Sequence, residues 1–195
     1  MDREILISGR GGQGVQLAAK VLAVAGMIEG RHVMQLSTFS GTMRGGSSTC
    51  TVVLADAPVE SPPVVPALWA GLALHPSGLQ AAIEKLRPSG LLLFDGAAFE
   101  RPPAVGDRRS FRLPPEAEPA ATGGGGGRSL AALGALAALT GIVSTGALER
   151  ALRSVLPGYR RHTLPRNLEC LRLGARALAT EAGRAPAWPT AAARA

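Results

Sequence analysis

Cysteine and aromatic residues are scarce in this 195-residue chain, and each shortage excludes a class of site. The two cysteines, Cys50 and Cys170, are too few and too far apart for a disulfide framework, an iron–sulfur site or a zinc site. We therefore expect two free thiols in a reducing cytoplasm. Aromatic residues make up 4% of the chain and include a single tyrosine, Tyr159, which disfavours a base-stacking platform for single-stranded nucleic acid.

Lysine is also rare, although the chain is basic. Only Lys20 and Lys85 are lysines among 21 basic residues, and the net charge is +7. Such a preference for arginine is typical of a GC-rich coding sequence rather than of selection for phosphate contacts. Residues 1–100 carry seven basic and eight acidic residues, whereas residues 101–195 carry fourteen and six. A nucleic-acid-binding module is therefore the least favoured of the functions considered for this chain.

Long hydrophobic runs are missing as well. The uncharged stretch 129–148 is long enough to cross a bilayer. It consists mostly of Ala, Gly, Ser and Thr and is broken at Thr140 and Gly141, so we expect a buried helix pair and no membrane contact. The N-terminus has no signal-peptide layout. These observations predict a cytoplasmic protein.

The pattern of apolar runs and glycine turns predicts an α/β fold. A short strand, a glycine turn, a helix and a second strand follow one another over residues 4–36. We expect a three-layer, Rossmann-like, largely parallel or mixed sheet flanked by helices, with a helical C-terminal segment. The later elements are expected as strands at 49–55, 68–74 and 91–94, a turn at 88–90, and helices at 76–86, 129–139, 145–156 and 165–182.

The same pattern predicts one domain, residues 1–182. Residues 96–128 contain five of the fifteen prolines and a run of five glycines at 123–127, so we interpret this stretch as a flexible insertion. Within it, only residues 110–113 alternate like a strand. Residues 183–195, with Trp188, are expected to be a disordered tail.

The first candidate site is the glycine turn GRGGQG at residues 9–14. Gly9, Gly11 and Gly14 have the spacing of a dinucleotide-binding loop, in which the backbone and a helix N-terminus approach a phosphate. A nicotinamide site also needs an acidic residue at the end of the second strand. Residues 35–38 contain none, which disfavours a simple dehydrogenase. The alternative is a tight turn that packs against another chain.

The second candidate site is the segment TMRGGSS at residues 42–48. Arg44 offers charge, Gly45 and Gly46 leave backbone N–H groups accessible, and Ser47 offers a hydroxyl, which together suit an anion. A solvated turn with a surface arginine is the alternative. If the strands that border the two segments are neighbours, both segments lie at one edge of the sheet, where α/β proteins bind ligands.

Catalytic groups are hard to find in this sequence. His32, His75 and His162 lie near no obvious nucleophile, and no carboxylate pair or set of metal ligands is evident. Asp95, at the end of a strand, could act as an acid or base, but such a residue more often caps the next turn. We therefore predict no catalytic residue and no metal ligand in this chain.

Taken together, these motifs resemble one known family. The segments ISGRGGQGV (7–15) and MRGG (43–46), followed by CTVV (50–53), are similar to the gamma subunit, or gamma domain, of 2-oxoacid:ferredoxin (acceptor) oxidoreductases. Further matches in the family's order are LRPSG (86–90), LGAL (133–136) and TGIV (140–143). The resemblance covers about residues 3–178, and the combination of the two glycine segments is far more specific than a generic glycine fingerprint.

The resemblance implies an accessory subunit of an enzyme that oxidatively decarboxylates a 2-oxoacid with coenzyme A. The products are acyl-CoA, CO2 and reduced ferredoxin, and the 2-oxoacid itself is left open. Thiamine diphosphate, Mg²⁺ and iron–sulfur clusters are then held by alpha and beta subunits, with a delta subunit as a further option, and ferredoxin is an indirect partner.

On the same resemblance, one group of residues contacts coenzyme A, its phosphates or a neighbouring subunit. These residues are Gly9, Gly11, Gly12, Gln13, Gly14, Arg44, Gly45, Gly46 and Ser47. The competing hypothesis is a stand-alone nucleotide- or phosphate-binding Rossmann-like module that uses the same two loops.

Overall fold

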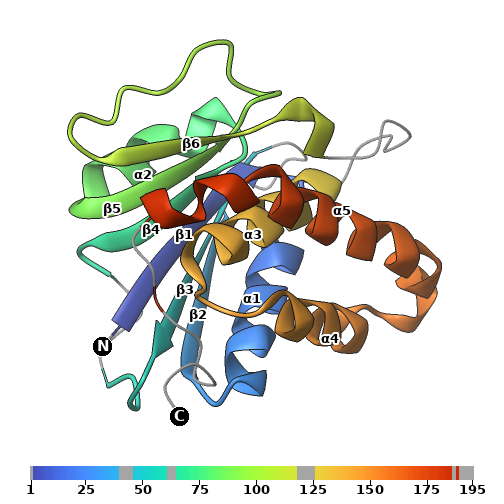
Figure 1. The fold of residues 1–195 in the computed structure, drawn as a ribbon. Helices are drawn as coiled ribbons and strands as arrows, with labels where there is room; N and C mark the ends of the chain where they lie inside the picture. Colours follow the sequence, from blue (N-terminus) through green and yellow to red (C-terminus); the bar gives the residue numbers. More distant parts are fainter. Residues whose placement is uncertain (1, 40–45, 61–64, 118–125, 186–187, 189–195) are drawn as a thin grey trace.

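The computed structural model describes the chain except for residues 1, 40–45, 61–64, 118–125, 186–187 and 189–195. Among the described residues, six strands form one mixed sheet in the order β2-β3-β1-β4-β5-β6 (Figure 1). The strands are β1 (Asp2–Arg10), β2 (His32–Phe39), β3 (Ser47–Ala55), β4 (Leu68–Ala73), β5 (Leu86–Asp95) and β6 (Arg109–Leu113). The predicted α/β class with a mixed sheet is confirmed.

The direction of β3 explains why the sheet is mixed. β3 lies between β1 and β2 and is antiparallel to both, whereas the successive pairs β1–β4, β4–β5 and β5–β6 are parallel. The β-α-β unit at the N-terminus therefore does not place β2 beside β1. This arrangement brings the end of β1 next to the start of β3.

Helices cover both faces of the sheet and complete three layers (Figure 1). The larger layer consists of α1 (Val15–Ile28), α3 (Gly127–Thr140), α4 (Thr145–Val155) and α5 (Leu164–Ala177). On the other face lies α2 (Leu79–Lys85). Short 3-10 segments are η1 (Pro76–Gly78), η2 (Pro115–Ala117), η3 (Gly158–Thr163) and η4 (Ala179–Arg184).

Side-chain alternation along β1 separates two cores. Ile5 and Ile7 are fully buried and belong to the cluster under the larger helical layer, whereas Leu6 belongs to the cluster under α2. This alternation is the period-2 pattern of a strand covered on both faces. It explains why the first strand is apolar at consecutive positions.

Two glycines allow α3 and α5 to lie in backbone contact. A Cβ atom added to Gly134 would come within 2.0 Å of the carbonyl oxygen of Leu171, and one added to Gly174 within 1.8 Å of that of Ala131. Because α3 is buried around almost its whole circumference, its neighbour must approach closely to exclude water. The glycines make that approach possible.

The structure differs from three expectations about the chain's irregular parts. Residues 109–113 form β6, which is parallel to β5, so the 96–128 stretch contributes a strand to the sheet. Residues 88–90 do not leave the sheet in a turn but belong to β5, where its register with β4 shifts. The predicted tail also differs at Trp188. Its indole is buried, and its amide donates to the carbonyl oxygen of Thr140 at 2.7 Å.

The buried Trp188 ring lies against two arginines, Arg3 near the start of β1 and Arg31 directly before β2. The Arg31 guanidinium lies 4.1 Å from the centre of the Trp188 ring, and the Arg3 guanidinium lies 5.4 Å from it. Such cation–π contacts favour a desolvated aromatic ring.

The uncharged stretch 129–148 is divided between α3 and the start of α4, with a left-handed Gly141 at the end of α3. In the part of the chain that the structure describes, no helix has the length and apolarity that a bilayer crossing requires.

Candidate functional site

The two glycine segments meet at the C-terminal end of β1. In the β1–β3 register, Gly9 lies opposite Ser48 and Arg10 opposite Ser47. Just beyond the strands, the amide of Gly11 donates a 2.9 Å hydrogen bond to the carbonyl oxygen of Gly46. The prediction that both segments lie at one edge of the sheet is therefore confirmed for the described residues Gly46 and Ser47. Arg44 and Gly45 lie outside the described residues.

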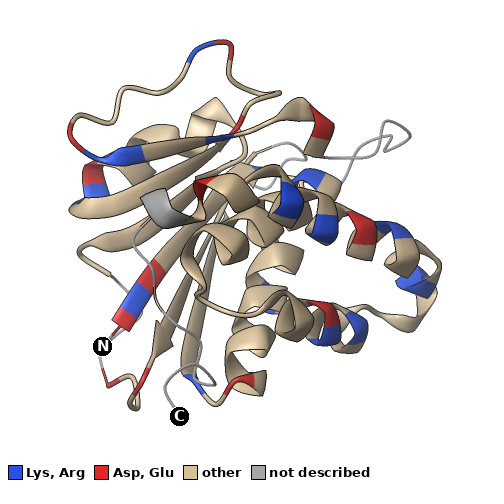
Figure 2. Cartoon of the chain, viewed as in Figure 1, with Lys and Arg blue, Asp and Glu red and all other residues tan. Residues whose placement is uncertain are grey.

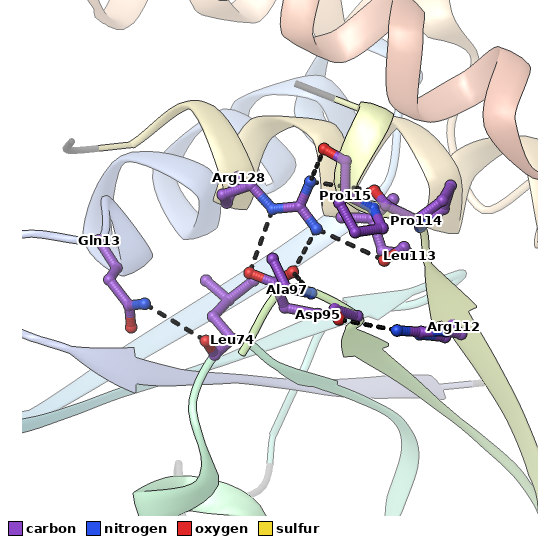
Figure 3. A network of polar contacts seen from close by, with 10 residues as sticks. Gln13, Leu74, Asp95, Ala97, Arg112, Leu113, Pro114, Pro115 and Arg128 are labelled. Carbon is purple, nitrogen blue, oxygen red and sulfur yellow. Dashed lines mark hydrogen bonds and ion pairs between the residues drawn. The ribbon is translucent and has the colours of Figure 1, made fainter. Parts of the chain in front are cut away.

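Gln13 closes the first glycine loop. Its side-chain carbonyl accepts a 2.6 Å hydrogen bond from the amide of Arg10, and its side-chain nitrogen donates to the carbonyl oxygen of Leu74 at 3.3 Å. Figure 3 shows the second of these bonds, which joins the loop to the end of β4. Both polar atoms of the Gln13 side chain are therefore engaged in holding the loop in place.

The glycines of the first loop have different surroundings. Gly9 is buried, and a Cβ atom there would meet the Gln13 side chain at 2.8 Å. Gly11 and Gly12 are exposed, and Gly12 has a φ of +97° with nothing within 4 Å of its Cβ position. A positive φ of this size favours glycine. Gly11 and Gly12 thus leave their backbone accessible, whereas Gly9 has a packing role.

The end of the polyglycine run lies against the first loop, a relationship that the sequence interpretation missed. A Cβ atom added to Gly14 would come within 2.5 Å of the Cα atom of Gly126. The Ser129 hydroxyl lies 2.8 Å from the carbonyl oxygen of Gly126 and 3.2 Å from that of Gly14, and it donates toward both. Gly126 and the Ser129 hydroxyl make this contact, but their partner Gly14 lies 112 and 115 positions earlier in the chain.

Two helix N-termini consequently converge at one place. α1 begins after Gly14 and α3 after Gly126. Neither start has a side-chain cap, and neither has an acidic residue in its first turn. The first N–H groups of a helix have no partner within the helix, and the helix dipole makes this end positive. The arrangement is suited to an anion with more than one charged group.

A chain of polar side chains from α1 and β2 hydrogen-bonds to the second segment. Gln16 on α1 donates to the Ser48 hydroxyl at 3.3 Å and accepts from the Ser37 hydroxyl at 2.5 Å. Ser37 also lies 3.3 Å from the Cys50 sulfur. Burial raises the pKa of the Cys50 thiol despite its hydrogen bonds with Ser37 and Gln35. A buried, protonated thiol is not a nucleophile.

Asp95 is an anchor for α3. Its carboxylate pairs with the Arg128 guanidinium through both oxygens, and Oδ1 also accepts from the Ala97 amide at 2.9 Å (Figure 3). Arg128 additionally donates to the carbonyl oxygens of Pro114 and Pro115 at 3.0 Å each. The interpretation of Asp95 as a turn cap is confirmed. Because its oxygens are occupied, the acid–base alternative has no geometric support.

His75 lies close to the glycine edge but faces its own turn. Its Nδ1 accepts a 3.1 Å hydrogen bond from the amide of Ser77 at the start of η1. Burial lowers the pKa of His75, and the nearby Arg10 guanidinium lowers it further. His32 and His162 are exposed on β2 and η3. The described residues contain no group of three or more His, Cys, Asp or Glu side chains arranged to hold a metal ion. That this chain contains no catalytic residue stays a prediction.

Comparison with known proteins identifies this class of domain. The family profile of pyruvate ferredoxin/flavodoxin oxidoreductase matches residues 4–177, and the chain belongs to that family. It is 32% identical over 177 residues to the 2-oxoglutarate synthase subunit KorC of Methanothermobacter thermautotrophicus, a match that covers 83% of this chain and 89% of KorC. Within the family, the protein is a gamma subunit of a 2-oxoacid:ferredoxin oxidoreductase.

Two solved structures show the same fold. The gamma subunit of a keto/oxoacid ferredoxin oxidoreductase from Geobacter sulfurreducens has a TM-score of 0.76 and 29% identity, covering 93% of this chain and 98% of that subunit. The 2-oxoglutarate:ferredoxin oxidoreductase from Magnetococcus marinus, with 2-oxoglutarate, coenzyme A and succinyl-CoA bound, has a TM-score of 0.80 and 20% identity. That match covers 97% of this chain and 33% of the longer one. Family membership favours the subunit over the stand-alone module.

Proposed function

We propose that the converging glycine segments hold the phosphate side of coenzyme A while the assembled enzyme oxidatively decarboxylates a 2-oxoacid. The observation that carries this proposal is the convergence of the α1 and α3 N-termini, both without a side-chain cap. Coenzyme A carries several phosphate charges, and uncapped helix starts stabilise such charges through their N–H groups and dipoles. Coenzyme A bound in the Magnetococcus enzyme is consistent with this role.

The geometry divides the proposed residues by task. Gly11 and Gly12 would offer backbone to the ligand, because both are exposed. Gly46 would lie beside them, because its carbonyl oxygen accepts a hydrogen bond from the Gly11 amide. Gly9, Gln13 and Gly14 would shape the loop, because their surroundings are already filled by protein atoms. Ser47, Gly45 and Arg44 would complete the second segment, with Arg44 supplying a full positive charge.

In this proposal, thiamine diphosphate, Mg²⁺ and iron–sulfur clusters belong to other subunits of the complex. Cys50 and Cys170 are both buried, on β3 and α5. The described part of the chain also has no ligand cluster for a metal. We therefore assign these groups to the alpha and beta subunits, whose chemistry releases CO2 and passes electrons toward ferredoxin. Two free thiols support a cytoplasmic setting for the complex.

Two glycines with the same backbone conformation provide a matched test. Gly12 and Gly30 have φ values of +97° and +74°, and at neither position would a Cβ atom meet anything within 4 Å. Gly12 belongs to the glycine loop, whereas Gly30 follows the far end of α1. Each Gly→Ala change should cost about 1 kcal/mol of folding stability, since both force alanine into the left-handed region.

In the assembled complex, Gly12→Ala should raise the KM for coenzyme A about tenfold, which corresponds to about one charge-assisted hydrogen bond. Gly30→Ala should leave this KM within about twofold of the wild type. Equal KM values for the two variants would contradict the proposed contact and favour the interpretation of the loop as packing against another subunit. The KM for the 2-oxoacid serves as the internal control.

A further inference from the structure

The turn between α4 and α5 is exposed and basic, and the side chains of its η3 segment do not pack in the hydrophobic core. Residues 145–178 contain seven arginines and two glutamates, a net charge of +5, and all seven arginines are exposed. They are Arg150, Arg153, Arg160, Arg161, Arg166, Arg172 and Arg176. Figure 2 shows this basic charge on the outer side of α4, α5 and the turn that joins them. We call these seven arginines, together with Tyr159, the basic helical surface.

The basic helical surface has few carboxylates of its own. Glu149 is engaged by Arg172, at 2.7 and 2.8 Å, and this pair lowers the pKa of Glu149. Among the ion pairs of the described residues, none involves Arg160, Arg161 or Arg166. Codon composition can favour arginine over lysine, but it does not explain why the excess gathers on one pair of helices. The unneutralised charge is left for another molecule.

An aromatic residue stands at the tip of this surface. Tyr159 is 74% exposed, and the Arg160 guanidinium lies 5.5 Å from the centre of its ring. Tyrosine and arginine are the residue types that dominate binding energy at protein interfaces. No residue of η3 is buried, so this sequence contributes nothing to the core of the isolated subunit.

The turn is nevertheless held in a defined conformation. The Arg160 amide donates to the carbonyl oxygen of Pro157 at 2.9 Å, the Thr163 hydroxyl donates to that of Arg160 at 2.8 Å, and Asn167 donates to the Thr163 hydroxyl at 3.2 Å. An exposed segment that is already ordered loses less entropy when it binds.

We infer that the basic helical surface docks against an acidic face of another protein subunit of the same oxidoreductase. The charge of the surface requires an acidic partner, and the Tyr159–Arg160 pair favours a protein over lipid or nucleic acid. In the Magnetococcus enzyme, the same fold makes up 33% of a longer chain. The inference rests on the role as an oxidoreductase subunit and is independent of the proposed coenzyme A contact.

The test is the affinity of this chain for the remaining subunits of its complex. The variant Arg160→Glu/Arg161→Glu reverses two charges at the tip of the surface. The control Arg101→Glu/Arg109→Glu makes the same change in net charge at two exposed positions, one in the connection before β6 and one at its first residue. Equal Tm values and circular dichroism spectra for the two variants establish that both fold.

At low salt, the tip variant should bind the remaining subunits about tenfold more weakly than the control, because close charge pairs at interfaces have coupling energies of this size or more. The difference should shrink in about 1 M salt, where the Debye length is about 3 Å. At saturating concentration, the tip variant should restore the wild-type KM for coenzyme A, which separates this inference from the proposed loop contact.

Equal affinities of the tip variant and the control at low salt would overturn the inference. It would also be overturned if the wild-type chain bound phosphatidylserine vesicles or duplex DNA through Arg160 and Arg161 while assembly was unaffected by the charge reversal. In either case, the basic helical surface would not be a subunit interface.

Discussion

The amide of Gly11 donates a 2.9 Å hydrogen bond to the carbonyl oxygen of Gly46, which ties together two glycine segments that are 35 positions apart in the chain. Because β1 and β3 are antiparallel neighbours, the end of one strand and the start of the other meet at this bond. A displacement of either segment must therefore move the other. The candidate site is a single unit built from two motifs.

Arg44 provides the first prediction, because it is the basic residue of the second motif. Arg44→Ala should raise the KM for coenzyme A in the assembled complex about tenfold or more, since a charged hydrogen-bond partner of a phosphate is lost. The kcat and the Tm should remain close to the wild type. Steady-state kinetics at varied coenzyme A concentration measure this effect, and an unchanged KM would make Arg44 a solvated surface residue.

The Asp95–Arg128 ion pair should contribute more to the free energy of unfolding than an ion pair on the surface does. The side chains are 4% and 15% exposed, respectively. Arg128→Met should cost about 3 kcal/mol, because it leaves a buried carboxylate without its partner. Asp95→Asn should cost less, because the carbonyl oxygens of Pro114 and Pro115 still accept from Arg128.

Urea denaturation of both single variants and the double variant measures the coupling between Asp95 and Arg128. We expect the double variant to lose less stability than the sum of the two single losses, since removing both charges leaves none uncompensated. Strictly additive losses would show that the two side chains do not stabilise one another.

The α3–α5 contact predicts opposite outcomes for two helical glycines. Gly134→Ala should destabilise the fold by about 3 kcal/mol, because the new Cβ atom would lie 2.0 Å from the Leu171 carbonyl oxygen and the backbones would have to separate. Gly146→Ala on α4 meets nothing closer than 3.8 Å. It should stabilise the fold by about 0.5 kcal/mol through helix propensity. Thermal or urea unfolding measures the stability of the two variants. Similar changes in their unfolding free energies would contradict the close approach of α3 and α5.

His75 predicts a pH dependence of stability. Its pKa in the folded state lies below the ordinary value of 6.5, so the unfolded chain binds a proton more readily as the pH falls. The contribution of this residue to stability should therefore decrease as the pH drops through the unfolded pKa. His75→Asn keeps an acceptor for the Ser77 amide but does not titrate.

The measurement for His75 is the difference in unfolding free energy between the wild type and His75→Asn from pH 8 to pH 5. Subtracting the variant cancels the contributions of the carboxylates common to both proteins. The wild type should lose stability relative to the variant toward pH 5. A flat difference would mean that the pKa of His75 is the same in the folded and unfolded chains.

Local patterns were enough to predict much of the fold. The alternation and glycine stops around residues 4–36 predicted β1, α1 and β2, and the leucines of residues 130–139 predicted the buried α3. These features depend on neighbours within a few residues. The antiparallel insertion of β3, the addition of β6 and the burial of Trp188 could not be predicted, because each depends on partners that are distant in the chain.

The low content of cysteine and lysine is a property of the sequence alone, whereas the contacts between distant residues are a property of the fold. The sequence by itself determined the two glycine motifs, the near absence of metal-ligating cysteine and the excess of arginine in the second half, because composition and spacing need no partner. Only the tertiary structure decided that Gly126 lies against Gly14, that Asp95 is occupied by Arg128, and that the arginines of α4 and α5 share one surface. Long-range packing of the helices on a mixed sheet brings those residues together, and no local pattern encodes it.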